Sequence, residues 1–374
     1  MDLGLNEAQQ MLKNSAREFL DAECPTTYVR EMEEDECGYS PEMWRKVAEQ
    51  GWLGLIFPEQ YGGFGMNFLD LSILLEEAGR VMLPGPMFST VVMGGMTILD
   101  AGSDEQKQEL LPQIGEGQLI VTLALTEPSA RWDALGVETS ATQSGDGWTI
   151  NGTKLFVPNA HVSDTYVVAA RTGDGDKDIS LFMVPSNAGG VSQTLLKTIA
   201  SDRQSEVVLN NVGVPASALL GEANKGWDTI EKVLAWGAIG KCAEMVGGAQ
   251  EVLDMTVEFA KQRTQFGRPI GSFQAIQHHC ANMATDVEGS RYITYQAAWR
   301  LSEGLPAQQE VAMAKAWVSD AYRRVCALGH QCHGAIGFTK EHNMQLYSRR
   351  AKAAELAFGD TDHHLEAVAE AIGL

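Results

Sequence analysis

The sequence predicts an α+β protein with a helical N-terminal domain at residues 1–120, a β domain at 121–225 and a C-terminal four-helix bundle at 226–374. The first observation behind this prediction is the hydrophobic pattern. Apolar residues recur every three or four positions in the outer parts and gather in short β-rich runs between them. The second is size: 374 residues, 44% hydrophobic and 21% charged, suffice for two or three domains with large cores.

The N-terminal part carries clear helix start and stop signals. Ser103-Asp-Glu-Gln106 matches a capping box, in which serine and glutamine side chains satisfy backbone N–H groups at the start of a helix. Pro112 follows in the same helix. We expect it to interrupt that helix, because proline lacks the N–H group that an α-helix needs.

The middle part reads as short strands. Asn151-Gly152 stands between two of the runs and predicts a hairpin turn there, since both residues tolerate the positive φ that such a turn requires. The runs are Leu119–Leu125, Trp148–Ile150, Lys154–Val157, Tyr166–Ala170, Leu181–Val184 and Val207–Leu209.

The C-terminal part shows three apolar stripes at helical spacing, and a fourth helix is expected near the C-terminus. Three long antiparallel helices with a fourth make a four-helix bundle the economical arrangement. The stripes are Val246, Ala249, Leu253, Val257 and Ala260; then Ile276, Cys280, Met283 and Val287; then Val311, Ala314, Val318, Ala321, Val325 and Leu328.

The formal net charge of −21 argues against binding to nucleic acid or to anionic lipid, because both need a basic surface. No apolar run reaches the roughly eighteen residues of a membrane span. The first twenty residues also lack a basic segment followed by an apolar one. We therefore expect a soluble, cytoplasmic protein that holds any anionic ligand with a few placed Arg, Lys or backbone N–H groups.

Neither the cysteines nor the histidines form a pattern typical of a metal site. The 6 cysteines are scattered and none belongs to a CxxC pair, so we expect neither zinc nor a disulfide framework. The pairs His278-His279 and His363-His364 lack i, i+4 spacing with a carboxylate ligand. We expect these histidines at the surface or at an interface.

One segment between the first two bundle helices, Arg263-Thr-Gln-Phe266-Gly-Arg-Pro-Ile-Gly-Ser-Phe-Gln274-Ala-Ile-Gln277, combines a cation, an aromatic ring and two amides. A guanidinium can bind a pyrophosphate with two parallel hydrogen bonds, and Phe266 is placed to line an adenine or ribose. The alternative interpretation is a plain loop with a surface arginine and a buried phenylalanine.

Six motifs decide between these interpretations, because in their order and spacing the chain resembles the acyl-CoA dehydrogenase family from end to end. They are Gly51-Trp-Leu-Gly-Leu-Ile-Phe-Pro-Glu-Gln-Tyr-Gly-Gly63, Leu125-Thr-Glu-Pro128, Gly152-Thr-Lys154, Leu220-Gly-Glu222 with Gly226-Trp227, the Arg263 segment, and Gln331-Cys-His-Gly334-Ala-Ile-Gly337-Phe-Thr339.

The resemblance implies FAD as cofactor, bound between two subunits. It places Arg263 at the pyrophosphate, Phe266 and Gln274 at the adenosine end, and Gln331 with the Gly334 backbone in the same region, all on a neighbouring subunit's cofactor. Thr126 would contact FAD on the flavin side. The resemblance also implies at least a dimer, commonly a dimer of dimers, an acyl-CoA substrate and an electron-transferring flavoprotein as acceptor.

The proteins that this chain resembles need a carboxylate base that removes a proton from Cα of the thioester while a hydride leaves Cβ for the flavin. One position used for that base aligns with Phe358 and the other with Gly237. Neither residue can accept a proton. Asp360 is the first alternative base and Glu355 a weaker one, although Asp360 is also placed to cap a helix that starts near Thr361.

The flavin-side motifs are altered as well. Arg131-Trp132 replaces the small Gly-Ser pair that approaches the FAD phosphates in similar proteins. Phe156-Val157-Pro158 replaces Trp-Ile-Thr, and proline offers neither hydroxyl nor N–H. These changes call into question the cofactor site formed by the chain's own β domain, whereas the contacts toward a neighbour's FAD are retained.

This asymmetry suggests the non-catalytic-type subunit of an α2β2 acyl-CoA dehydrogenase acting on a bulky thioester, such as one with a steroid side chain. The alternatives are a homomeric dehydrogenase with a displaced base such as Asp360, a flavin monooxygenase or oxidase on the same fold, and a binding module that has lost catalysis.

Overall fold

Helices occupy both ends of the chain and strands its middle in the computed structural model, which describes residues 4–374. The predicted α+β class, with helices, then strands, then helices, is confirmed. The helices are α1 (Glu7–Glu23), α2 (Thr26–Glu34), α3 (Pro41–Glu49), α4 (Phe68–Val81), α5 (Met96–Ala101), α6 (Asp104–Gly115), α7 (Gly226–Gln262), α8 (Gln274–Ser302), α9 (Gln308–His333), α10 (Met344–Leu356) and α11 (Thr361–Ala371). The strands are β1 (Val121–Ala124), β2 (Ser140–Ser144), β3 (Gly147–Pro158), β4 (Thr165–Arg171), β5 (Ile179–Pro185), β6 (Val191–Leu196), β7 (Gln204–Pro215), β8 (Leu219–Leu220), β9 (Thr264–Gln265) and β10 (Arg268–Pro269).

Contacts within the chain group these elements into two compact units. The helical unit contains the described residues up to Glu31, Asn67–Leu83 and Ala238–Leu374. The β unit contains Met32–Met66 and Pro84–Gly237. Helix α7 contributes to both units, since its first turns belong to the β unit. The boundaries expected at residues 120 and 225 stay predictions.

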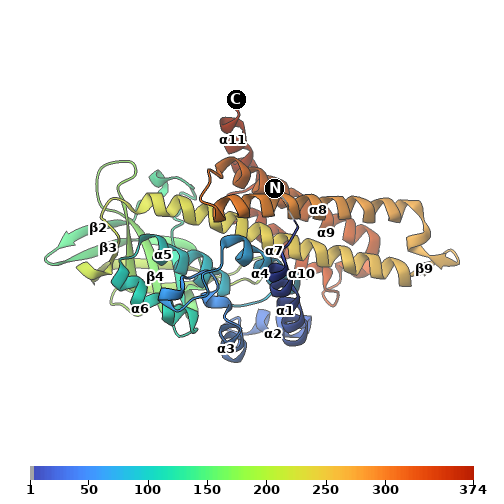
Figure 1. Ribbon diagram of the computed structural model, residues 1–374, viewed down its shortest axis with the longest axis horizontal. Helices are drawn as coiled ribbons and strands as arrows, with labels where there is room; N and C mark the ends of the chain where they lie inside the picture. The colour runs from blue at the N-terminus through green and yellow to red at the C-terminus, as the bar shows by residue number, and fades with distance from the viewer. Residues whose placement is uncertain (1–3) are drawn as a thin grey trace. The chain divides into compact units, whose positions relative to one another are not determined.

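In the helical unit, α9 packs against α8, α10 and α11, and Figure 1 shows α8 and α9 running side by side. The predicted apolar stripe of α9 is buried from Val311 to Val325. The stripes of α7 and α8 are buried less completely than expected: Leu253, Val257 and Cys280 stay half-buried. On α7, Val252 and Thr256 face the interior of the helical unit instead.

Helices α4 and α7 cross at glycines. A β-carbon on Gly247 would overlap the carbonyl oxygen of Glu76, and one on Gly79 would overlap the carbonyl oxygen of Glu244. The two backbones can approach this closely only because neither position carries a side chain.

Buried charges join α4 to α1 and α8. The Glu76 carboxylate accepts hydrogen bonds from Lys13 Nζ (2.8 Å), Arg291 Nε (3.2 Å) and the Tyr295 hydroxyl (2.7 Å). Burial pushes the pKa of Glu76 upward, but the opposing charges of Lys13 and Arg291 hold it below its usual range. Glu76 is therefore ionised and ties α1, α4 and α8 together.

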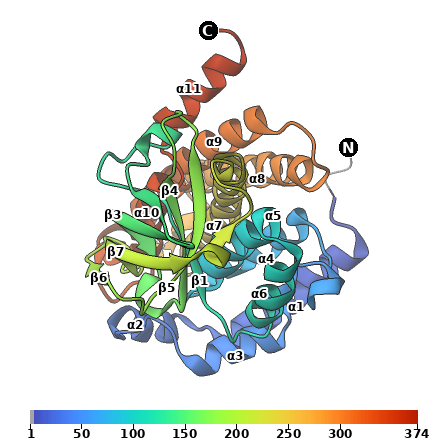
Figure 2. The same ribbon diagram turned by 90° about the vertical axis from the view of Figure 1, so that its left-hand side faces the viewer.

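The β unit is built on an 8-stranded sheet in the order β6-β7-β3-β2-β4-β5-β8, with β1 pairing parallel to β4. Figure 2 looks onto this sheet. Most of the other pairings are antiparallel. The hydrophobic core formed by the strands includes Ile150, Tyr166, Phe182 and Val207, each fully buried.

The hairpin expected at Asn151-Gly152 is wrong. Strand β3 runs through both residues and is irregular there, with a shift of register against β7 between Ile150 and Gly152. The tight turn lies earlier, at Gly145 and Asp146, between the paired residues at the ends of β2 and β3. Asn151 uses its side chain to accept a hydrogen bond from the Asn211 N–H (2.8 Å), so its polar character serves the sheet.

The capping box at Ser103 is confirmed: its side chain accepts from Gln106 N, and the Gln106 side chain accepts from Ser103 N. The interruption expected at Pro112 is wrong, because α6 continues through it to Gly115. Pro112 is in the last turn of this helix, where its missing N–H costs only one hydrogen bond before the helix ends.

Candidate functional site

The segment that follows α7 is a short antiparallel hairpin at one end of the long helices (Figure 1). Phe266 (φ 53°) and Gly267 (φ 78°) form its two-residue loop, and positive φ at both positions is typical of a type I′ turn. Phe266 is 92% exposed, so the interpretation as a loop with a buried phenylalanine is wrong. Arg263 and Gln274 are exposed on either side of the loop.

The second segment expected to contact a cofactor lies at the end of α9. Gln331 is exposed, and Gly334 ends the helix with φ 66° and ψ −145°, a conformation essentially restricted to glycine. A β-carbon on Gly334 would meet no atom within 4 Å, so the main chain is open to an approaching group. The ring of His333 stacks on Phe259 with centroids 4.5 Å apart. Since Phe259 lies one turn before Arg263, the two segments adjoin.

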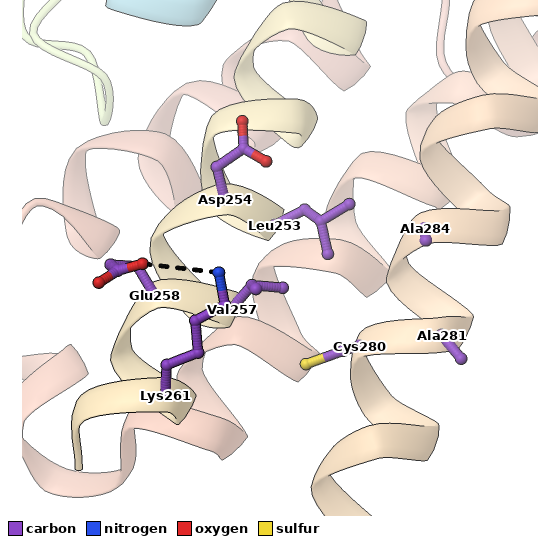
Figure 3. Close-up of a pocket in the computed structure, with 8 residues that line it drawn as sticks. All are labelled: Leu253, Asp254, Val257, Glu258, Lys261, Cys280, Ala281 and Ala284. Carbon is purple, nitrogen blue, oxygen red and sulfur yellow. Dashed lines mark ion pairs between the residues drawn. The ribbon is translucent and has the colours of Figure 1, made fainter. Parts of the chain in front are cut away.

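A shallow groove lies between α7 and α8, near the two helix ends that the hairpin connects. Its volume is about 610 Å³. Leu253 and Val257 project into it from α7 and Cys280 from α8, while the Glu258–Lys261 ion pair stands at its edge (Figure 3). The half-buried stripe residues of the two helices are therefore the walls of an open apolar groove.

The turn between α10 and α11 carries Phe358, at the position expected for a base. Phe358 and Gly359 both have positive φ, 58° and 89°. Lys315 reaches this turn from α9: its Nζ donates to Glu355 O (2.8 Å), Gly359 O (2.9 Å) and Ser319 Oγ (3.1 Å). Burial lowers the pKa of Lys315 to about 8, and three acceptors match the three ammonium hydrogens.

His364 and Asp360 complete this turn. His364 Nε2 lies 2.8 Å from Phe358 O, and because a carbonyl only accepts, Nε2 carries the proton. His364 is buried within its own chain, which corrects the expectation of a surface or interface position. The Asp360 carboxylate accepts from His363 N at 3.0 Å and caps α11. Glu355 pairs with Arg323 and Lys352.

In the β unit, Thr126 is fixed by a buried ion pair next to it. Lys154 Nζ donates to Glu127 Oε1 (2.6 Å) and to Leu125 O (3.2 Å). The same carboxylate accepts from Glu138 N and Thr139 N. The Thr126 carbonyl accepts from Leu155 N (2.8 Å), so the backbone on both sides of Thr126 is held.

The loop after Thr126 closes on itself. Arg131 forms an ion pair with Asp133 (2.7 Å), and Asp133 Oδ1 accepts from Gly136 N (3.2 Å). Arg131 packs so closely over Gly136 that a β-carbon there would lie 2.8 Å from Arg131 Cβ. Next to Arg131, the large side chain of Trp132 is half-buried.

A hollow of about 410 Å³ adjoins this loop within the β unit. Trp132 and Trp227 contribute apolar walls, whereas Asp133, Asp176 and Glu231 bring carboxylates against the single cation of Lys177. Because carboxylates outnumber cations, this hollow does not favour the phosphates of a coenzyme.

The two halves of the site fit FAD differently. The hairpin and Gly334 offer an exposed guanidinium, an exposed ring and open backbone, which suit an adenosine diphosphate. On the β unit, Pro158 has no donor, and Phe156 stands exposed with φ 53°. With the closed Arg131 loop as well, the β unit does not fit the flavin and its phosphates.

Sequence reasoning missed the roles of two residues that hold the α10–α11 turn, Lys315 of α9 and His364 of α11, and it left Arg268 of the hairpin without a role. Lys315 gave a signal, since a lysine between Ala314 and Ala316 interrupts an apolar stripe. His364 gave none, because its burial depends on how α11 folds back onto α9. Within residues 4–374, no group of three or more His, Cys, Asp or Glu side chains is arranged to hold a metal ion. No helix in that range is long and apolar enough to cross a membrane.

Three family models cover nearly the whole chain. They describe the N-terminal domain (residues 6–118), the middle domain (122–212) and the C-terminal domain (224–373) of acyl-CoA dehydrogenase. The chain belongs to the acyl-CoA dehydrogenase family. The predicted enzyme class, an oxidoreductase acting on a CH–CH bond, is confirmed with it.

Two relatives illustrate the range of the family. A probable acyl-CoA dehydrogenase, YngJ, of Bacillus subtilis is 34% identical over 97% of both chains. The CarC subunit of the caffeyl-CoA reductase–Etf complex of Acetobacterium woodii is 34% identical over 92% of both.

Several solved structures superimpose on the whole chain. Butyryl-CoA dehydrogenase from Megasphaera elsdenii has a TM-score of 0.93 at 31% identity and full coverage of both chains. A chain of the ChsE4-ChsE5 complex from Mycobacterium tuberculosis has 0.91 at 30%, covering 100% of this chain and 99% of that one. An FAD-dependent dehydrogenase has 0.91 at 27%, with both chains fully covered. FAD is thereby confirmed as the cofactor of this family.

Proposed function

We propose that this chain is a subunit of an FAD-dependent acyl-CoA dehydrogenase that completes the FAD site of a related subunit and does not supply the catalytic base. The partner subunit provides the base and the flavin cradle. This chain provides the contacts to the adenosine diphosphate half of that FAD through Arg263, Phe266, Gln274, Gln331 and Gly334.

The observation that carries the proposal is the α10–α11 turn. Phe358 stands at the position expected for the base. The turn is held by His364 at Phe358 O and by Lys315 at Gly359 O. Asp360, the first alternative base, is engaged as the cap of α11. Neither residue is arranged to remove a proton from a thioester.

The contrast between the two halves of the site supports the same proposal. The hairpin is exposed, and no carboxylate among residues 4–374 forms an ion pair with its arginines, whereas the Arg131 loop is closed by its own ion pair. A chain that retains contacts for a neighbour's cofactor while its own cradle is closed suits an assembly of unlike subunits. The ChsE4-ChsE5 complex, to which this chain is similar, is named for two different proteins.

The substrate that we propose is a bulky acyl-CoA thioester, bound mainly by the partner. A chain without its own acyl site leaves room in the assembly for a large ring system. We propose an electron-transferring flavoprotein as the acceptor, because the similar CarC protein is a subunit of a complex with Etf.

The test is the flavin absorbance per chain, for the protein purified alone and after co-expression with the most similar dehydrogenase-like protein of the same genome. We expect little flavin alone and about one FAD per two chains in the complex. One FAD per chain in the protein alone, together with turnover of an acyl-CoA, would overturn the proposal.

A further inference from the structure

The hairpin carries a second arginine on the same face as Arg263. Gln265 pairs with Arg268 across the hairpin, and Ile270 N donates to Arg263 O (2.8 Å), so Arg263 lies opposite Ile270. Residues two apart on a strand share a face, and so do residues directly opposite each other. Arg263 and Arg268 therefore project from one face as diagonal neighbours, roughly 7–8 Å apart at their backbones and within reach of each other's guanidinium groups.

Neither arginine is neutralised by the protein. Within residues 4–374, no carboxylate forms an ion pair with Arg263 or Arg268, although the chain carries a formal net charge of −21. Both side chains are exposed. Two unpaired cations side by side repel each other, and an anion with two charged groups relieves that repulsion.

Arg268 is also held in one orientation. Its guanidinium carbon lies 4.2 Å from the centre of the Phe273 ring. A guanidinium stacked on an aromatic ring keeps its N–H groups in its own plane, where they remain available to donate. This brace reduces the freedom that Arg268 would lose on binding a ligand.

The loop between the two arginines is strained. Phe266 is not glycine, yet it has φ 53°. The residue is 92% exposed, and its ring lies edge-on to the Phe273 ring with centroids 6.1 Å apart. A bulky residue with positive φ costs free energy, and an exposed ring gains nothing from solvent in return. The strain is consistent with a ring held out for a ligand.

We propose that Arg268 joins Arg263 as the second cation of a diphosphate clamp, with Phe266 as the surface on which the attached nucleoside lies. The ligand class is a nucleoside diphosphate unit, and in the assembly it is the adenosine diphosphate half of FAD. The proposal rests on the proposed function for the identity of the bound cofactor, but the role of Arg268 is separate from it.

The experiment measures FAD affinity by titrating the flavin-free complex and following flavin fluorescence. The variants are Arg263→Gln, Arg268→Gln and Arg268→Lys, with Lys261→Gln as the control that removes a neighbouring exposed cation. We expect Arg268→Gln to weaken FAD binding roughly 10- to 100-fold, as the loss of a charge-assisted contact to phosphate does. Arg268→Lys should restore part of the affinity, and Lys261→Gln should leave it unchanged.

Ionic strength provides a second readout. The dependence of FAD affinity on salt concentration should be shallower in Arg268→Gln than in the parent, because one phosphate contact is lost. If Arg268 only packed on Phe273, Arg268→Gln would lower the melting temperature without changing the salt dependence of FAD affinity.

The outcomes separate this proposal from the proposed function. Loss of affinity in Arg263→Gln with full affinity and an unchanged salt dependence in Arg268→Gln would overturn the clamp and leave the proposed function standing. If neither variant changes FAD affinity, the contacts assigned to this chain in the proposed function fail as well. Should the chain bind FAD as a homo-oligomer, the same titration on it decides the role of Arg268.

Discussion

Lys315 is a charged residue in the interior of the helical unit, surrounded by the apolar face of α9. Its side chain is fully buried, and each ammonium hydrogen has an oxygen acceptor. Two of those acceptors are main-chain carbonyls, Glu355 O in the last turn of α10 and Gly359 O in the turn that follows it. Lys315 therefore stabilises the turn by satisfying groups that would otherwise be buried and unpaired.

Replacing Lys315 by Met tests this role. We expect the free energy of unfolding to fall by roughly 2–4 kcal/mol, because two buried carbonyls lose their donor. Lys352→Met is the control, since the Lys352 side chain is half-exposed and its partner Glu355 keeps an ion pair with Arg323 when Lys352 is replaced. Surface pairs contribute about 0–1 kcal/mol. Urea unfolding measures the free energy of unfolding of both variants. An equal loss of that free energy in both would contradict the role of Lys315.

Substitutions of Asp360 can show whether this residue caps α11 or acts as the catalytic base. As the N-cap of α11 it should tolerate Asp360→Asn with little change in stability, because asparagine caps about as well as aspartate, whereas Asp360→Ala should cost about 1 kcal/mol. We expect turnover of the assembled enzyme to survive in Asp360→Asn. Abolished turnover with unchanged stability would identify Asp360 as the base and restore the homomeric alternative.

At the scale of elements, the α10–α11 turn makes stability depend on pH. Burial lowers the pKa of His364 to about 4, below its unfolded value of 6.5. The unfolded chain then binds the proton more readily than the folded chain. The contribution of His364 to stability is therefore complete above pH 6.5 and is lost as the pH falls toward 4. The groups that face His364 are Lys315, His363 and Asp360.

We expect His364 to contribute roughly 3 kcal/mol of stability at pH 7 that disappears near pH 4. His364→Gln removes the titration while leaving an amide that can donate to Phe358 O. Urea unfolding at pH 7 and at pH 4.5 should therefore show a smaller difference in His364→Gln than in the parent. His363→Gln, at an exposed position, should behave like the parent. Equal pH dependence in all three proteins would refute the prediction.

The Glu127–Lys154 pair joins β1, β2 and β3 around Thr126. Burial lowers the pKa of Lys154 to about 8 despite the attraction of Glu127. Lys154→Met should cost roughly 3–5 kcal/mol, because it leaves a buried carboxylate without its counter-ion. In the double variant Glu127→Gln/Lys154→Met the loss should be clearly smaller than the sum of the single losses. Additive losses in denaturant unfolding would show that the two side chains do not interact.

Elements with a regular pattern could be predicted from the sequence, and those decided by packing could not. The capping box at Ser103 and the buried stripe of α9 depend on local spacing, and both are as expected. Asn151-Gly152 has the composition of a turn, but pairing with β7 on the other side keeps β3 extended. The segment around Phe266 was singled out by its residue types, but its hairpin form was not predicted. The burial of His364 was not predicted either, because it depends on how α11 packs.

At the scale of the whole molecule, the groove and the hairpin belong to one surface of the helical unit. Leu253, Val257 and Cys280 in the groove are half-buried although their stripes predict full burial. Helices of another subunit that contact the hairpin's ligand would be placed to cover them. Apolar surface of this kind favours association of chains that their net charge would otherwise keep apart.

Ala281→Arg tests whether the groove is covered in the assembly. Ala281 is exposed in the isolated chain, so the change should not affect folding, but an arginine in the groove should prevent another helix from packing there. We expect a shift toward dissociated chains in mass photometry. Asn282→Arg, exposed and outside the groove, serves as the control. An unchanged mass distribution for Ala281→Arg would place the contact between subunits elsewhere.

The glycine crossing of α4 and α7 limits how the helical unit can move. Sliding α7 by one turn would bring Ala243 or Glu251 to the place of Gly247, against the Glu76 carbonyl, where even a β-carbon has no room. Shear between these two helices is blocked at that contact. They move as one rigid piece, and a conformational change in this unit has to leave that contact intact.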